Sequence, residues 1–122
     1  MAVGLCFLRQ KEDGTWEGDG ELRGWTEFGD LQDVYLARGG PLFIYFREDE
    51  YEFDLDTGEP PYPVKVSEDL ARTLLDWIER ERVKALAVLR EIADEEVEPY
   101  THSVKRLLEK FLEEGYAVLV SP

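Results

Sequence analysis

The fold class is decided within residues 60–78, PPYPVKVSEDLARTLLDWI. Prolines interrupt regular structure at the start of this stretch, and Ser67 then provides a favourable N-cap for a helix. Beyond Pro63 the chain contains no glycine before Gly115 and no proline before Pro99, which is typical of helical segments. The stretch therefore marks the change from a strand-rich first half to a helical second half.

Before this stretch, glycines, aromatic residues and alternating apolar positions predict strands. We expect strands at residues 3–9, 21–28, 42–46 and 51–56, and the continuously apolar third one is expected to be central in the sheet. Turns are expected at Asp13-Gly14 and across Gly18–Gly20. Asp30 is expected to cap a short helix over residues 31–38.

After this stretch, an apolar stripe predicts helix from Ser67 to about residue 98, with a bend or break near residues 80–84 because one helix of this length would be long for the domain. A further helix is expected from Thr101 or Ser103 to Gly115, followed by a strand over residues 116–120. Residues 1–122 are therefore predicted to form a single α+β domain. It combines an N-terminal antiparallel sheet of four to five strands, two or three C-terminal helices and a final returning strand.

The chain of 122 residues has 28 acidic and 14 basic residues, and its net charge is −14. Direct binding to nucleic acid or to an anionic membrane is disfavoured, because both ligands require a basic surface. Asparagine is absent and Glu is abundant, a composition typical of thermophile proteins, and a high-GC genome would produce part of the same bias. The single cysteine excludes a disulfide within the chain and suggests a reducing, cytoplasmic location.

An acidic segment around residues 48–56 is the most specific candidate site. In an extended strand, residues two apart share a face, so four carboxylates would project together at intervals of about 6.6–6.8 Å. Such a comb would resemble the spacing of nucleic-acid phosphates and would fit a basic groove. The alternative is a solvated face or an edge strand charged against aggregation. The predicted partner-binding residues here are Glu48, Asp49, Glu50, Glu52, Asp54 and Asp56.

A second acidic cluster surrounds the first predicted hairpin and contains a tryptophan. Trp16, Glu17 and Asp19 are added to the predicted partner-binding residues, because an exposed tryptophan among carboxylates would be a natural interface anchor. The alternative is that Trp16 packs back onto the sheet.

Other chemistry receives little support from the sequence. Asp54 and Asp56 occupy the first two ligand positions of a calcium loop, but Gly58, Glu59 and Lys65 stand where further ligands and the required glycine would be. His102 is the only histidine, and no glycine-rich phosphate loop opens a helix. We therefore predict no catalytic residue, no metal site and no cofactor.

The leading functional hypothesis is a small, acidic, non-enzymatic protein that occupies a basic surface on a protein partner as an inhibitor or regulator. Such a partner would be a nucleic-acid-processing enzyme or a toxin. One form of this hypothesis is that the protein is a nucleic-acid mimic of the phage or host-defence type. One alternative is a small metal-binding protein or enzyme that uses the carboxylates of Asp54 and Asp56. Another is a structural subunit whose acidity serves solubility, or an immunity protein that neutralises a toxin.

Overall fold

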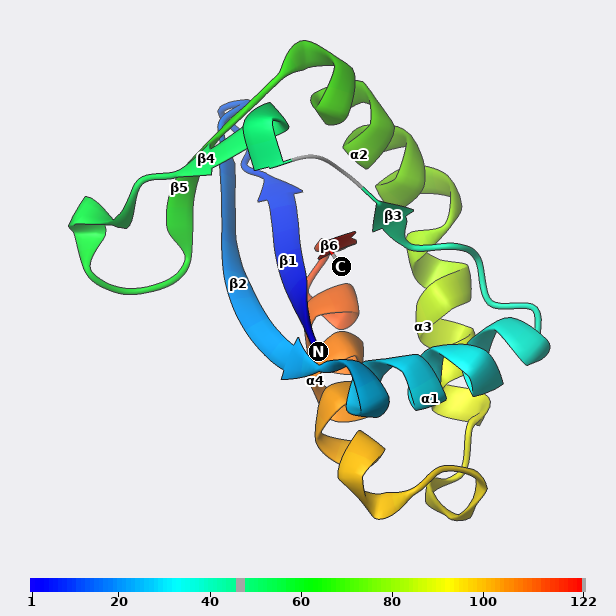
Figure 1. The fold of residues 1–122 in the computed structure, drawn as a ribbon. Coiled ribbons are helices and arrows are strands. Elements are labelled where there is room, and N and C mark those ends of the chain that lie inside the picture. The colour runs from blue at the N-terminus through cyan, green and yellow to red at the C-terminus, as the bar shows by residue number, and fades with distance from the viewer. Residues whose placement is uncertain (46–47, 122) are drawn as a thin grey trace.

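The computed structural model describes residues 1–45 and 48–121. Within these segments, strands and helices form an α+β domain (Figure 1), as the sequence predicts. The strands are β1 (Ala2–Gln10), β2 (Trp16–Gly24), β3 (Ile44–Tyr45), β4 (Tyr51–Phe53), β5 (Tyr62–Val66) and β6 (Ala117–Ser121). The helices are α1 (Trp25–Ala37), α2 (Glu68–Arg80), α3 (Arg82–Glu91) and α4 (His102–Glu113). Short 3₁₀ turns lie at Glu48–Glu50, Leu55–Thr57, Asp94–Glu96 and Pro99–Thr101.

The described strands form one mixed sheet in the order β3-β6-β1-β2-β5-β4. Every pairing is antiparallel except that of β3 with β6. The returning strand β6 therefore enters between β3 and β1 instead of joining the outside of the sheet. In Figure 1, α4 lies behind β1, and α2 and α3 stand along the β3 side of the sheet.

The central strand is β1, and both of its faces are buried. Val3, Leu5 and Phe7 point to α4, where the ring of Phe7 stacks on Phe111. Cys6 and Leu8 are buried on the opposite face. An apolar run is typical of strands buried on both faces, and β1 carries such a run, although residues 42–46 were expected to be central.

The prediction that residues 42–46 form the central strand of the sheet is wrong. Its described part forms the two-residue strand β3 at the edge, and Phe46 lies outside the described residues. Leu42 is not available to a strand ladder, because its carbonyl accepts a hydrogen bond of 2.8 Å from Nε1 of Trp77 on α2. Phe43 packs against Tyr35 with ring centroids 4.8 Å apart. The apolar run thus serves the junction of α1 and α2 with the sheet edge.

The second strand and first helix also differ from the prediction. Gly18 and Gly20 lie inside β2, and α1 begins at Trp25 instead of following Asp30. A Cβ atom at Gly18 would lie only 2.1 Å from the carbonyl oxygen of Phe7. This glycine therefore allows close approach of two strands, whereas the sequence suggested a turn.

The predictions for the helical half are confirmed in several details. Ser67 Oγ accepts a hydrogen bond from the amide of Leu70 (3.2 Å), as an N-cap does. Helix α2 ends at Arg80 and α3 begins at Arg82, with Glu81 as the capping residue between them, so the break lies inside the expected range of residues 80–84. Gly115 has a φ of 96°, the left-handed conformation that follows many helix ends.

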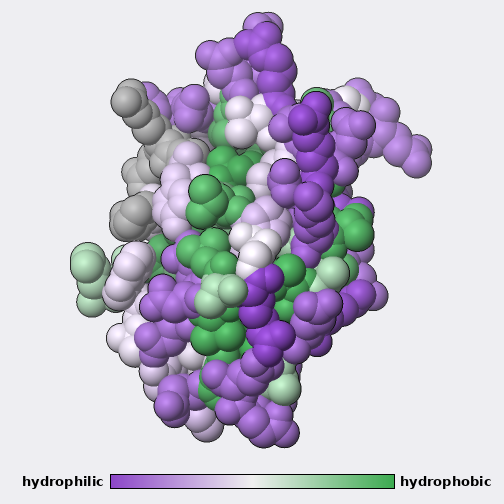
Figure 2. All heavy atoms as spheres, turned by 90° about the vertical axis from the view of Figure 1, so that its right-hand side faces the viewer, coloured by the Kyte–Doolittle hydropathy of each residue, from purple (hydrophilic) through white to green (hydrophobic). Residues whose placement is uncertain are grey.

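The outer side of α2 and α3 carries hydrophobic residues bordered by hydrophilic ones (Figure 2). Leu75 of α2 and Val83 of α3 are among the exposed apolar residues on these two helices. Their buried neighbours Leu74 and Leu86 attach the helices to the core. Among the helices of the described segments, none combines the length and apolar character needed to cross a lipid bilayer.

Candidate functional site

The segment predicted to be an acidic strand is mostly not a strand. Only Glu52 lies within β4, whereas Glu50 ends a 3₁₀ turn before it and Asp56 lies in a 3₁₀ turn after it. The side chain of Asp54 accepts a hydrogen bond from the amide of Asp56 (3.0 Å), and Gly58 closes the turn at a φ of 81°. A short polar side chain that bonds its own backbone favours a turn over a strand. The evenly spaced comb of four carboxylates is therefore wrong.

The acidic residues nevertheless remain on one segment of the surface. We call them the hairpin acidic surface, defined as Asp49, Glu50, Glu52, Asp54 and Asp56. Asp49, Glu52, Asp54 and Asp56 are exposed, and Glu50 is partly buried. None of the five carboxylates forms an ion pair with a described residue, in contrast to seven other acidic residues of the chain. The side chain of Glu48 lies outside the part of the chain that the structure describes.

Lys65 is the cation closest in register to this surface. It stands opposite Glu52 in the pairing of β4 with β5. It lines two shallow hollows of about 450 and 400 Å³, the first with Asp49 and Glu50 and the second with Asp54 and Asp56. The hairpin acidic surface is thus concave on both sides of Lys65 and carries an excess of negative charge.

Trp16 packs onto the sheet and does not project from it. It is only 8 % exposed and stands opposite Val64 of β5. The part of the ring that remains accessible lines a hollow of about 380 Å³ together with Asp54 and Lys65. The structure therefore brings Trp16 next to the hairpin acidic surface, but as the wall of a hollow and not as a protruding anchor.

Glu17 and Asp19 have partners of their own. Glu17 accepts from Nε of Arg9 (3.1 Å), and Asp19 accepts from the backbone amide of Gly20 (2.8 Å). Since side chains alternate along β2, these two residues lie on the opposite face of the strand from Trp16. The eight predicted residues whose side chains the structure describes therefore do not form one continuous surface.

A larger acidic hollow was not anticipated from the sequence. We call it the acidic groove; it has a volume of about 640 Å³ and lies between α1 and residues 94–100. Its carboxylates are Asp30, Asp33, Asp94, Glu95, Glu96 and Glu98. It lies at the opposite end of the molecule from β4 (Figure 1). Two features of the sequence could have indicated this groove: the run of acidic residues at 94–98 and the i, i+3 spacing of Asp30 and Asp33. They were not combined, because the two segments meet only in the folded structure.

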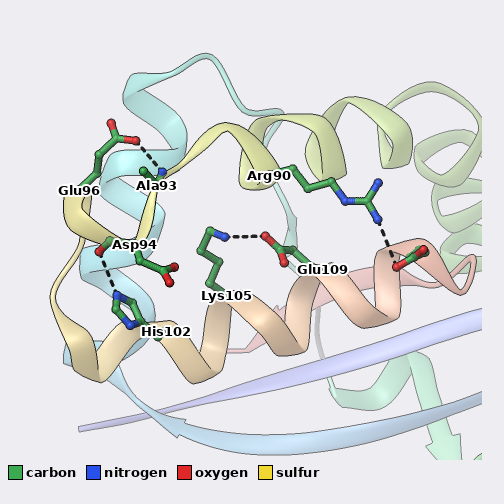
Figure 3. Close-up of polar contacts among 8 residues, drawn as sticks. Arg90, Ala93, Asp94, Glu96, His102, Lys105 and Glu109 are labelled. Carbon is green, nitrogen blue, oxygen red and sulfur yellow. Dashed lines mark hydrogen bonds and ion pairs between the residues drawn. The ribbon is translucent and has the colours of Figure 1, made fainter.

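Polar contacts fix the walls of the acidic groove. Tyr100 donates its hydroxyl hydrogen to the carboxylate of Asp30, and this bond together with the charge of Asp30 raises the pKa of Tyr100 to about 12. Arg38 pairs with Glu96, whose other oxygen accepts from the amide of Ala93 (2.7 Å). Figure 3 shows the contact between Glu96 and Ala93. It also shows His102, whose Nε2 lies 3.0 Å from the carbonyl oxygen of Asp94. The only histidine therefore supports the wall of the groove.

Lys105 of α4 is buried and is matched by one carboxylate. Its Nζ lies 2.7 Å from Oε1 of Glu109, one turn further along the helix (Figure 3). Nearby, Arg90 of α3 reaches Glu113 of α4 (3.1 Å). These pairs lie where α3 packs on α4, so they serve the packing of the helices and leave no free charge for a ligand.

The alternative hypothesis of a metal site or enzyme would use Asp54 and Asp56. Asp54 is already engaged as the acceptor for the amide of Asp56. Over residues 1–45 and 48–121, no three or more His, Cys, Asp or Glu side chains are arranged to hold a metal ion. No protein-family model, curated protein or solved structure matches this chain.

Proposed function

We propose that this protein binds a basic surface of a partner protein and thereby blocks or regulates it, with the hairpin acidic surface as the contact region. The observation that carries the proposal is the combination of unpaired carboxylates with the neighbouring hollow that Trp16 lines. The carboxylates of Asp49, Glu50, Glu52, Asp54 and Asp56 have no cationic partner among the described residues. These unpaired charges lie together at one end of the folded molecule, and the whole chain has a net charge of −14. Such a distribution attracts a basic surface at long range.

Charge and packing would have separate roles in this complex. The carboxylates would mainly accelerate association and select a basic partner. The hollow lined by Trp16, Asp54 and Lys65 would receive an apolar or aromatic side chain of the partner, because tight contacts depend on a few desolvated groups. Nucleic-acid-processing enzymes and basic toxins are the partner classes with suitable surfaces.

Two variants that remove the same number of charges test which surface binds. The first changes Asp49→Asn, Glu50→Gln, Glu52→Gln and Asp56→Asn, and it retains Asp54 because that side chain holds the turn. The matched control changes Asp33→Asn, Asp94→Asn, Glu95→Gln and Glu98→Gln in the acidic groove, whose side chains form no ion pair or hydrogen bond with a described residue. A labelled deca-arginine peptide is a suitable basic probe for association kinetics over a salt series.

We expect the hairpin variant to associate with the probe about tenfold more slowly than wild type at about 0.1 M salt. The groove variant should associate nearly as fast as wild type. Equal losses in both variants would mean that only net charge matters, and a loss confined to the groove variant would assign binding to the groove. Either result would contradict the proposed contact region.

A further inference from the structure

The outer edge of β2 is only partly covered by β5. Strand β2 pairs with β1 along its whole length, but β5 pairs with it only from Trp16 to Gly18. Asp19–Gly24 lack this pairing, and the segment Gly20–Gly24 forms an outer margin of the sheet that leads to α1 (Figure 1). We call this segment the β2 edge. It lies outside both acidic surfaces, so the inference below is independent of the proposed function.

Several backbone amides and carbonyls of the β2 edge point away from β1 and have no hydrogen-bond partner among the described residues. The amide of Trp25 donates to the carbonyl of Met1 (3.0 Å), and antiparallel ladders alternate between bonded and non-bonded pairs. The odd-numbered residues of β2 therefore bond to β1, and the even-numbered residues direct their amides and carbonyls outward. The outward amide and carbonyl of Leu22 have no hydrogen-bond partner among the described residues.

Two neighbouring groups of the edge are already engaged. The amide of Gly20 donates to the carboxylate of Asp19 (2.8 Å). Gly24 is the N-cap of α1, so its carbonyl accepts the first hydrogen bond of that helix. The outward groups that remain are the carbonyl of Gly20, both groups of Leu22 and the amide of Gly24.

We propose that the β2 edge pairs with the β2 edge of a second copy of this chain, antiparallel and about a two-fold axis at Leu22. In this register the two Leu22 residues exchange two hydrogen bonds, and each Gly24 amide faces the Gly20 carbonyl of the other copy. The pairing uses the four groups that remain on each edge and leaves the two engaged groups undisturbed. An interface about a two-fold axis must be self-complementary in this way.

The side chains are complementary in the same register. Glu21 of one copy lies opposite Arg23 of the other, and opposite charges at facing positions stabilise an antiparallel pair. Within one chain Nη2 of Arg23 lies 2.8 Å from Glu21, and Nε of Arg23 is buried with no described acceptor. Leu22 faces its own counterpart on the other side of the sheet, where it is 74 % exposed in one chain. Glu21 and Arg23 cancel in charge, so two strongly acidic chains meet here without opposing carboxylates.

The association should be weak and should strengthen with salt. The contact is short compared with the interfaces of stable dimers, and two chains of charge −14 repel each other at long range. Salt screens repulsion between distant charges more than it weakens close pairs in the interface. We therefore expect a concentration-dependent dimer that is more populated at about 0.5 M than at about 0.05 M salt.

Charge reversals on the β2 edge provide the test, with sedimentation velocity as the measurement. Glu21→Arg and Arg23→Glu each place like charges opposite each other twice in the dimer, and each should raise the dissociation constant about tenfold or more. The double variant Glu21→Arg/Arg23→Glu restores opposite charges and should recover the wild-type constant. Circular dichroism of each monomer verifies that the variants fold. A wild-type chain that stays monomeric, or a dimer that ignores these changes, would overturn the proposal.

Amide hydrogen exchange gives a second measurement that needs no variant. The amides of Leu22 and Gly24 should exchange rapidly in dilute solution and become protected at concentrations where the dimer forms. The amide of Glu21 bonds to β1 and should be protected at both concentrations. Unchanged exchange of Leu22 in a sample that contains dimer would place the interface elsewhere.

Discussion

Phe7 of the central strand lies face to face with Phe111 of α4, with ring centroids 4.0 Å apart and ring planes inclined by 6°. This contact joins the first strand of the chain to its last helix. Tyr116, directly before the returning strand, meets Phe111 edge-on at 5.1 Å, and Arg9 lies over the ring of Tyr116 at 4.5 Å. The aromatic contacts therefore connect the two ends of the sequence in one part of the core.

Removing the ring of Phe111 should destabilise the whole domain. Phe111→Ala leaves a cavity beneath β1, and we expect the free energy of unfolding to fall by about 3–5 kcal/mol. Phe111→Leu keeps an apolar side chain and should lose less. Urea denaturation measures both, with Leu75→Ala on the exposed side of α2 as the control. A loss no larger than that of the control would show that the stacked pair is not important for stability.

Gly18 should not tolerate a methyl group. A Cβ atom there would lie 2.1 Å from the carbonyl oxygen of Phe7 and 2.6 Å from Cδ2 of Leu8, so the strands must separate. We expect Gly18→Ala to cost about 1–3 kcal/mol or more. Gly4→Ala is the matched control, because its Cβ would meet its nearest neighbour at an ordinary 3.6 Å. Thermal unfolding of both variants compares them, and equal melting temperatures would contradict the close-approach argument.

Sequence patterns predicted those elements whose own residues determine them. Six apolar residues in β1, the cap at Ser67 and the stop at Gly115 are local signals, and they predicted the first strand and the limits of the helices. The errors fell where a distant contact decides the outcome. Gly18 was interpreted as a turn because the carbonyl of Phe7 above it could not be seen from the sequence. The central strand was assigned to residues 42–46 because the sequence does not show that Trp77 donates a hydrogen bond to the carbonyl of Leu42.

The candidate site was predicted in part for the same reason. The acidic residues at 49–56 are adjacent in sequence, so their grouping on one surface could be foreseen. Their uneven arrangement could not be foreseen, because the side chain of Asp54 accepts a hydrogen bond from the amide of Asp56 and the expected strand becomes a turn. The acidic groove was missed because Asp30 and residues 94–98 are far apart in the chain and meet only when α1 packs beside the turn that precedes α4.

The hydroxyl of Tyr100 should titrate at unusually high pH. Its hydrogen bond to Asp30 and the nearby negative charge raise its pKa to about 12, because ionisation would remove the donor and place two negative charges together. Since the folded pKa lies above the ordinary value of about 10, the contribution of this contact to stability is present below pH ~10 and is lost as the pH rises through the folded value.

Asp30→Asn tests this assignment directly. The variant removes the negative charge and should move the pKa of Tyr100 back toward about 10. Ultraviolet difference spectra follow tyrosine ionisation, and subtraction of the Tyr100→Phe titration isolates this residue. An unchanged pKa in Asp30→Asn would show that Asp30 is not the cause of the shift.

Duplex DNA should not bind this protein. The chain carries a net charge of −14, and association with DNA requires cationic groups that displace the counterions of the phosphates. Fluorescence anisotropy of a labelled duplex at about 0.1 M salt should remain constant as protein is added. A binding curve that weakens with salt would reveal a basic surface and would contradict the expectation drawn from charge.

Neutralising the hairpin acidic surface should leave stability unchanged or raise it slightly. Glu50→Gln and Glu52→Gln break no ion pair with a described residue, and removing like charges from neighbouring positions relieves repulsion. Glu17→Gln is the control with the same chemical change, and it removes the negative charge from the 3.1 Å ion pair with Arg9. This control should lose about 0.5–1 kcal/mol. Urea denaturation at about 0.05 M and about 0.5 M salt separates the two effects, because the gain from relieved repulsion should vanish at the higher salt. If the hairpin variants lose as much stability as Glu17→Gln, their carboxylates hold the fold together and are not free to meet a partner.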